Sequence, residues 1–179
     1  MTFPASPPLY HHDLLDAASR VGQIELSFGY VFRNKMLCIE ALKSSGAYSP
    51  LYFQGHILPI ANNNRLALIG DRALSMTVCE IWWATGDAPR ECVKMERCTV
   101  TRVALAQKGK SMGIDALVLV HENLDVAHPN KVAETFEAIL GAIYVDSNFS
   151  LRRLKQIIRK IGLIQNEYPR QPDEVKEKI

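Results

Sequence analysis

The sequence predicts an all-α domain, and three observations carry that prediction. Apolar residues recur at the i, i+3, i+4, i+7 spacing of a helix face in one segment after another. Two of these segments, residues 65–84 and 131–145, are apolar nearly all round, which is typical of helices buried in the middle of a domain. The alternating pattern of a β-hairpin is not evident anywhere. We therefore expect a bundle of helices packed around two central ones.

The N-terminal half begins with two shorter helices. Residues 14–24 and 35–42 have helical spacing, and the turn between them is marked by residues 28–30, Phe-Gly-Tyr. Residues 44–64 are rich in Ser, Pro, Gly and Asn and are expected to form a loop. This loop ends in Asn62, Asn63 and Asn64. These residues are good caps for the first central helix, because an Asn side chain accepts hydrogen bonds from the free N–H groups at a helix start.

The C-terminal half is also expected to be mainly helical. Residues 86–89, Gly-Asp-Ala-Pro, end the first central helix. Residues 91–112 are expected to form one or two helices that stop at Gly113, whereas the short apolar segment 116–120 is compatible with a strand or a helix. Residues 151–161 are expected to close the domain as an amphipathic helix with its basic residues outward.

Composition indicates a single globular domain. The chain has 179 residues, 47% of them hydrophobic and 22% charged, which excludes disordered and low-complexity classes. We expect residues 1–13 to form a mobile N-terminal segment, residues 14–162 the folded domain, and residues 163–179 a charged C-terminal tail. No membrane span or secretory signal is visible, so an intracellular location is expected: cytoplasm or nucleus, with the mitochondrion also open. The four cysteines form no C-x-x-C pair and are expected to be reduced, mostly buried thiols.

The positive charge is unevenly distributed along the chain. The net charge is only +2, from 21 Lys and Arg against 19 Asp and Glu, which is low for a protein that binds nucleic acid. Two segments, residues 89–110 and 151–161, nevertheless concentrate basic side chains. Each is either a stripe that contacts phosphates or an ordinary solvated helix face.

Three acidic residues stand on the two central helices. Asp71 follows Gly70 on the first, and Glu134 and Glu137 lie three residues apart on one face of the second. Gly70 and Gly141 would allow the two helices to approach closely. Converging carboxylates repel one another unless a cation compensates, and hard oxygen ligands suit Mg²⁺. The plainer alternative is a solvated helix face, and the spacing alone does not exclude it.

Two segments around these acids are similar to known signature motifs. NNRLALIGDRAL, residues 63–74, is similar to N-E-R-L-E-F-L-G-D, and ETFEAILGAIYVDS, residues 134–147, to D-x-F-E-A-x-x-G-A-I-Y-x-D. SFGYVFRNKMLCIEAL, residues 27–42, and MERCTVTRVALAQKGKSMGID, residues 95–115, agree with the flanking segments in order and spacing. Over residues 14–162 the chain thereby resembles the nuclease domain of the ribonuclease III family, and the resemblance implies that family's helical, dimer-forming endonuclease fold.

The resemblance also implies a catalytic metal site with one departure from the family pattern. Four acids bind Mg²⁺ in the family, and Mn²⁺ is an alternative ion. Asp71, Glu134 and Glu137 match three of these positions as catalytic and metal-binding residues, with Glu134 in place of an Asp. Ala67 replaces the fourth acid, one helical turn before Asp71. This loss is expected to weaken the hold on a second cation most, whereas the longer Glu134 offers partial compensation.

The partners implied by the resemblance are double-stranded or structured RNA and a second copy of the chain. Leu68 matches the residue that plugs into the partner subunit of the homodimer, and the alternative is an ordinary core residue. Double-stranded RNA is recognised by its shape and phosphates. Too few residues follow Gly162 for a separate RNA-binding domain, so RNA affinity is expected from this domain or from an RNA-binding partner protein. The candidate RNA contacts are Arg65, Arg97, Arg102, Lys108 and Lys131.

Two functional interpretations follow. The first is a divergent, metal-dependent endoribonuclease of the ribonuclease III type, which acts in RNA processing, leaves 5′-phosphates, and is weakened by Ala67. The second is a catalytically impaired domain that acts as an RNA-binding, mitochondrial-ribosome or assembly protein. The retained acids favour the enzyme, whereas Ala67 and the expected lack of a separate RNA-binding domain favour the alternative. The Ala-bearing pattern is similar to that of divergent fungal members of the family. We expect the enzyme.

Overall fold

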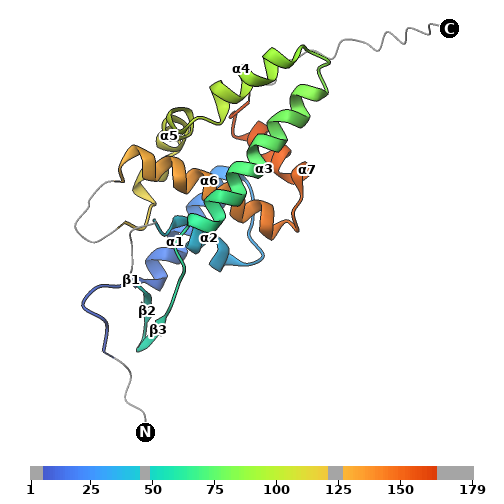
Figure 1. Cartoon of the computed structure of the whole chain (residues 1–179). Helices are drawn as coiled ribbons and strands as arrows, with labels where there is room; N and C mark the ends of the chain where they lie inside the picture. The colour runs from blue at the N-terminus through green and yellow to red at the C-terminus, as the bar shows by residue number, and fades with distance from the viewer. Residues whose placement is uncertain (1–5, 45–48, 121–126, 165–179) are drawn as a thin grey trace, which may run out of the picture.

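The computed structural model describes residues 6–44, 49–120 and 127–164, and within these ranges the chain is mostly helical (Figure 1). The predicted all-α class is confirmed, and the expected helices agree with the observed ones to within a few residues. The ends of the two expected terminal segments, residues 1–5 and 165–179, lie outside the described residues. The helices are α1 (Leu14–Phe28), α2 (Lys35–Leu42), α3 (Asn64–Trp83), α4 (Pro89–Thr99), α5 (Arg102–Ser111), α6 (Pro129–Asp146) and α7 (Leu151–Lys160), with a 3-10 turn at Ile114–Ala116.

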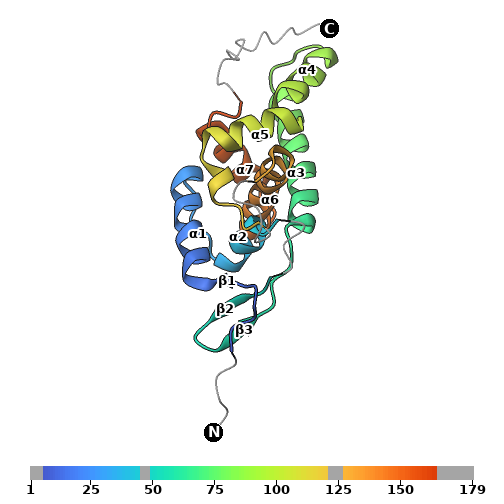
Figure 2. The same cartoon turned by 90° about the vertical axis from the view of Figure 1, so that its left-hand side faces the viewer.

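The two apolar segments form the centre of the domain, as predicted. Helix α6 packs against α2, α3, α5 and α7 and is enclosed by them, which both views show (Figures 1 and 2). Its side chains Phe136, Ile139 and Ile143 are fully buried. A helix that is apolar nearly all round is stabilised most when neighbouring helices cover its apolar faces. No helix in the described ranges has the length and apolar character needed to cross a membrane.

A small three-stranded sheet was not predicted. β2 (Leu51–Phe53) and β3 (His56–Leu58) form an antiparallel hairpin, and β1 (His12–Asp13) adds to β2 in parallel. The hairpin turn consists of Gln54 and Gly55, whose φ angles of 45° and 85° are those of a type I′ turn. The expectation that this region lacks a hairpin was wrong, because strands of three residues are too short to show alternation and Gln-Gly is not a common turn pair.

The segment after Gly113 is neither a continuous helix nor a strand. Ile114–Ala116 form the 3-10 turn, and Leu119 then makes an isolated parallel bridge with Lys43. The N–H of Leu119 donates to the carbonyl oxygen of Leu42 at 2.8 Å. The chain thus passes beside the end of α2 before residues 121–126, which lie outside the described residues.

Asn63 tethers the start of α3 but does not cap it with its side chain. Its backbone angles, φ −76° and ψ −3°, are helical, whereas a capping residue is extended. The fully buried Asn63 side chain instead donates from Nδ2 to the carbonyl oxygen of Ala41 and to Oγ1 of Thr135, both at 3.3 Å. The predicted cap was therefore wrong at this residue, and its amide links α2, α3 and α6.

Asp146 ties the end of α6 to the turn between α1 and α2. Its carboxylate accepts hydrogen bonds from the Tyr30 hydroxyl at 2.7 Å and from the N–H groups of Arg33 and Asn34, both at 2.9 Å. Burial raises the pKa of Asp146, but these hydrogen bonds to the charged form outweigh burial and the net pKa is lowered. Burial, followed by the hydrogen bond to Asp146, raises the pKa of Tyr30 to about 12.

Candidate functional site

The candidate site lies where α3 and α6 cross with their backbones in contact. A Cβ atom on Gly70 would lie 1.9 Å from the carbonyl oxygen of Glu137, and one on Gly141 would lie 2.0 Å from that of Leu66. Atoms other than hydrogen cannot approach this closely, so both positions require glycine. The predicted close approach is confirmed, and it sets Asp71, which follows Gly70, beside Glu137.

The three predicted acids are neighbours at this crossing. The pKa of Glu137 is raised to about 7, first by burial and then by the negative charge of Asp71. Arg102 lowers it and Glu134 raises it further. A carboxyl group whose pKa is raised by neighbouring carboxylates gains from a bound cation, because the cation offsets the repulsion between the negative charges. The charge distribution therefore fits a divalent metal ion.

The side chains of Asp71 and Glu134 are directed to neighbouring cations. Asp71 Oδ2 lies 3.5 Å from Arg72 Nη1, and Glu134 Oε2 lies 3.0 Å from Lys131 Nζ. Both acids keep part of their surface exposed, 31% for Asp71 and 19% for Glu134. Within the described residues, the oxygens of the three acids do not all come within 4.8 Å of one another. Rotation of exposed side chains is needed before they share one ion, and Mg²⁺ accepts water at its remaining positions.

The position of the missing fourth acid is part of the core. Ala67 is 6% exposed and lies one turn before Asp71 on α3. Its methyl group supplies no oxygen ligand, so the site has three carboxylates. The longer Glu134 is engaged with Lys131.

Two of the five predicted RNA-contacting cations lie at the acids. Lys131, in the first turn of α6, forms the ion pair with Glu134, and Arg102, at the start of α5, is close enough to Glu137 to lower its pKa. Arg72 is a third cation there, and it was not predicted from the sequence. Residues one apart on a helix do not usually face each other, so its pairing with Asp71 had no signal in the pattern.

The other three predicted RNA contacts lie elsewhere. Arg97 is exposed in the last turn of α4. Arg65 is near α2, where its charge opposes the burial that raises the pKa of Glu40. Lys108 Nζ on α5 lies close to Gly162, beyond the end of α7. The five cations therefore do not form one patch in the monomer.

Leu68 is on the surface. Its side chain is 63% exposed, so the alternative of an ordinary core residue is excluded. Met76 and Trp83, at 54% and 78%, follow it on the same helix. With 100° per residue, these three positions fall within about 80° of one another around α3. They form an exposed apolar stripe, and its contact with a partner subunit stays a prediction.

Comparison with known proteins shows similarity to ribonuclease III proteins. Residues 64–148 match the model of the ribonuclease III domain. Ribonuclease 3 of Rhodopirellula baltica is 29% identical over 139 residues, which are 73% of this chain and 48% of that protein. Ribonuclease 3 of Rickettsia prowazekii is 27% identical over 146 residues, 78% of this chain and 62% of that protein. The match thus spans about half the length of the first relative and less than two thirds of the second.

A solved structure shows the same fold. The nuclease domain of ribonuclease III from Campylobacter jejuni superposes with a TM-score of 0.65 at 23% identity, over 79% of this chain and 94% of that chain. The family match contains both motif segments, the Gly70–Gly141 crossing and the three acids. Residues 64–148 of the chain are therefore assigned to the ribonuclease III domain.

Proposed function

We propose that this protein is a divalent-cation-dependent endoribonuclease of the ribonuclease III type that cleaves double-stranded or structured RNA. One observation carries the proposal. Asp71, Glu134 and Glu137 lie together at the α3–α6 crossing, and their mutual repulsion, added to burial, raises the pKa of Glu137 to about 7. Carboxylates that are grouped despite their repulsion are typical of cation sites that serve phosphate chemistry.

The three acids would hold Mg²⁺, or Mn²⁺ in its place. When bound, such a cation supplies positive charge that stabilises the phosphodiester oxygens during hydrolysis. Asp71 and Glu134 would exchange their ion pairs with Arg72 and Lys131 for the cation. The freed cationic side chains are then available to RNA phosphates next to the site.

Arg102 completes this arrangement from α5. It lies at the N-terminal end of that helix, where the positive end of the helix dipole and the guanidinium both favour an anion. RNA phosphates would therefore be attracted to the rim of the acidic site by Arg102, Arg72 and Lys131, and oriented there before cleavage. Because Ala67 leaves the site one carboxylate short, we expect weaker binding of a second cation. We also expect slower cleavage than a site with four acids would give.

Cleavage of a long double-stranded RNA tests the proposal. The wild-type protein is expected to cut it with Mg²⁺ or Mn²⁺ and to lose this activity reversibly with EDTA. Asp71→Asn and Glu137→Gln are each expected to slow cleavage by at least about 10²-fold, because each removes a charged ligand at the reacting phosphate. The melting temperature of each variant shows that it is folded.

Asp16→Asn is the matched control, because Asp16 is an exposed acid on α1 that forms an ion pair with Arg20. Its cleavage rate should equal that of the wild type. Binding of RNA without cleavage in either cation would contradict the enzyme and favour the catalytically impaired, RNA-binding alternative. Unchanged cleavage in Asp71→Asn would show that these acids do not form the catalytic site.

We further propose a homodimer through the apolar stripe of Leu68, Met76 and Trp83. The nuclease domain from Campylobacter jejuni has a region involved in dimer formation, and exposed apolar stripes commonly mark interfaces. Leu68→Glu is expected to convert a dimer to a monomer at micromolar concentration in sedimentation equilibrium, and the monomer should keep the helical circular dichroism spectrum of the wild type. Val103→Glu, which alters a 68% exposed apolar residue on α5, should leave the dimer intact. A wild-type protein that sediments as a monomer would contradict the proposal.

A further inference from the structure

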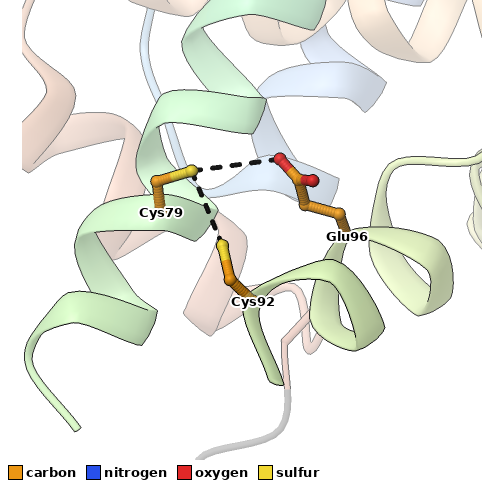
Figure 3. Close-up of side chains that lie close together, drawn as sticks. All are labelled: Cys79, Cys92 and Glu96. Carbon is orange, nitrogen blue, oxygen red and sulfur yellow. Dashed lines mark hydrogen bonds between the residues drawn. The ribbon is translucent and has the colours of Figure 1, made fainter. Parts of the chain in front are cut away.

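A second group of metal-ligating side chains lies between α3 and α4, away from the acids. Cys79 comes from α3, and Cys92 and Glu96 come from α4, where they are four residues apart on one helix face. Figure 3 shows the three side chains pointing toward one another across the helix pair. One ligand atom from each lies within 4.8 Å of the other two. Cys79 is eight residues after Asp71, about 12 Å along α3, so this is a separate place in the fold.

This group was not predicted from the sequence. Mostly buried thiols were expected, whereas only Cys38 of the four is buried; Cys79 and Cys92 are half-buried and Cys98 is exposed. Cys79 and Cys92 meet because α4 folds back along α3 after a turn in which Gly86 has a φ of 75°. Trp82 Nε1 secures this turn by donating to the carbonyl oxygen of Ala88 at 3.2 Å.

The distances fit a tetrahedral zinc ion. Two thiolates bound to one Zn²⁺ at about 2.3 Å each lie about 3.8 Å apart, and Sγ of Cys79 and Sγ of Cys92 are 3.7 Å apart. A sulfur and a carboxylate oxygen on the same ion lie about 3.5 Å apart, and Cys79 Sγ is 3.9 Å from Glu96 Oε1. The ligand atoms of Cys92 and Glu96 also lie within 4.8 Å of each other, so a movement of the Glu96 side chain toward the two sulfurs completes the ligand set.

We propose that Cys79, Cys92 and Glu96 form a Zn²⁺ site that clamps α4 to α3, with water as the fourth ligand. Thiolates select Zn²⁺ over Mg²⁺, which prefers oxygen ligands only. The half-buried side chains leave one open side for water.

The rest of the α4 packing is sparse, which gives the clamp a structural role. Of the eleven residues of α4, Met95 and Thr99 are the buried ones. A helix held by so little apolar surface gains little free energy from burial. A metal ion that joins it to the central helix α3 would fix its position, together with Arg97, one of the candidate RNA contacts.

Cobalt substitution tests the site on the whole protein. The reduced, metal-free chain is titrated with Co²⁺ and then with Zn²⁺. We expect the near-ultraviolet charge-transfer band of a cobalt–thiolate bond at one equivalent per chain, and its loss when Zn²⁺ displaces Co²⁺. Excess Mg²⁺ should not remove the band. The acids at the α3–α6 crossing cannot produce this band, because they contain no sulfur.

The variants identify the ligands. Replacement of groups that only support a ligand costs 10–100-fold in metal affinity, so Cys79→Ser and Cys92→Ser are each expected to weaken Zn²⁺ binding by at least about 10²-fold. Glu96→Gln should keep the band with at least about tenfold weaker binding. Cys98→Ser, on the exposed side of the same helix, is the matched control and should bind as the wild type does.

Three results would overturn the proposal: no cobalt–thiolate band in the wild type, unchanged binding in both Cys79→Ser and Cys92→Ser, or equal loss in Cys98→Ser. Counting free thiols in the same samples distinguishes the metal site from a redox-active cysteine pair. Formation of a Cys79–Cys92 disulfide in air, combined with no zinc binding in the reduced protein, would show a redox pair instead of a metal site. Zinc binding should also slow hydrogen exchange of the α4 amides in the wild type but not in Cys79→Ser.

Discussion

Gly70→Ala is expected to destabilise the protein by at least about 3 kcal/mol, because overpacking of a core typically costs 1–3 kcal/mol and here the added atom meets backbone. The new Cβ would lie 1.9 Å from the carbonyl oxygen of Glu137 and 2.8 Å from the nitrogen of Gly141. A backbone cannot rotate away as a flexible side chain does, so α3 and α6 must separate. Urea unfolding followed by circular dichroism measures the loss.

The same substitution should also reduce RNA cleavage in the fraction that remains folded. Separation of the helices moves Asp71 away from Glu137, and a displacement of about 1 Å at a catalytic site can cost 10²-fold in rate. Gly22→Ala is the matched control, because a Cβ on Gly22 in α1 has nothing within 4 Å. It is expected to stabilise the protein by about 0.5–1 kcal/mol, since Ala is favoured over Gly inside a helix. A Gly70→Ala variant as stable as the wild type would contradict the backbone contact.

Asp146→Ala is expected to cost about 2–4 kcal/mol of unfolding free energy, because the buried Tyr30 hydroxyl left without a partner costs about 1–3 kcal/mol and two part-buried hydrogen bonds to the carboxylate are lost as well. The substitution removes the acceptor of the hydrogen bonds from the Tyr30 hydroxyl and from the N–H groups of Arg33 and Asn34. Asp16→Ala, which removes an exposed ion pair with Arg20, should cost less than about 1 kcal/mol. Equal losses in the two variants would show that the Asp146 hydrogen bonds contribute little.

The pH dependence gives a second readout for Asp146. Its pKa is lower in the folded protein than in the unfolded chain. Its stabilising contribution is therefore complete above the ordinary pKa of about 3.9 and is lost as the pH falls through the folded pKa. The difference in stability between the wild type and Asp146→Asn should be constant from about pH 5 to pH 7 and should shrink in more acid solution. A difference that grows on acidification would contradict the lowered pKa.

The helices could be predicted because their signal is local. Helix α2 has the predicted bounds, and α3, α6 and α7 begin and end within two residues of the expected positions. Apolar spacing repeats within each segment, so the face that will be buried is readable without knowing what covers it. The two glycines and three acids could be placed on their helices for the same reason.

The contacts between distant segments could not be predicted in this way. Asp146 binds groups more than a hundred residues earlier, around Tyr30, and nothing near either residue indicates the other. Asn63 stands where a cap is usual, yet its amide reaches α2 and α6. The β2–β3 hairpin consists of strands too short to show a period. Each of these depends on which surfaces meet after the helices pack.

The same distinction between local signals and contacts of distant segments applies to the candidate site. Periodicity and the two motif segments established the central helices, the residues Asp71, Glu134 and Glu137, and the absence of an acid at Ala67. Packing then settled that glycine contact at Gly70 and Gly141 brings the acids from two helices to one place. It also settled that Arg72 joins them, and that two cysteines thirteen residues apart face each other with Glu96. The reason is physical: the 3.6-residue repeat is a property of one segment, whereas a metal site is made of distances between segments.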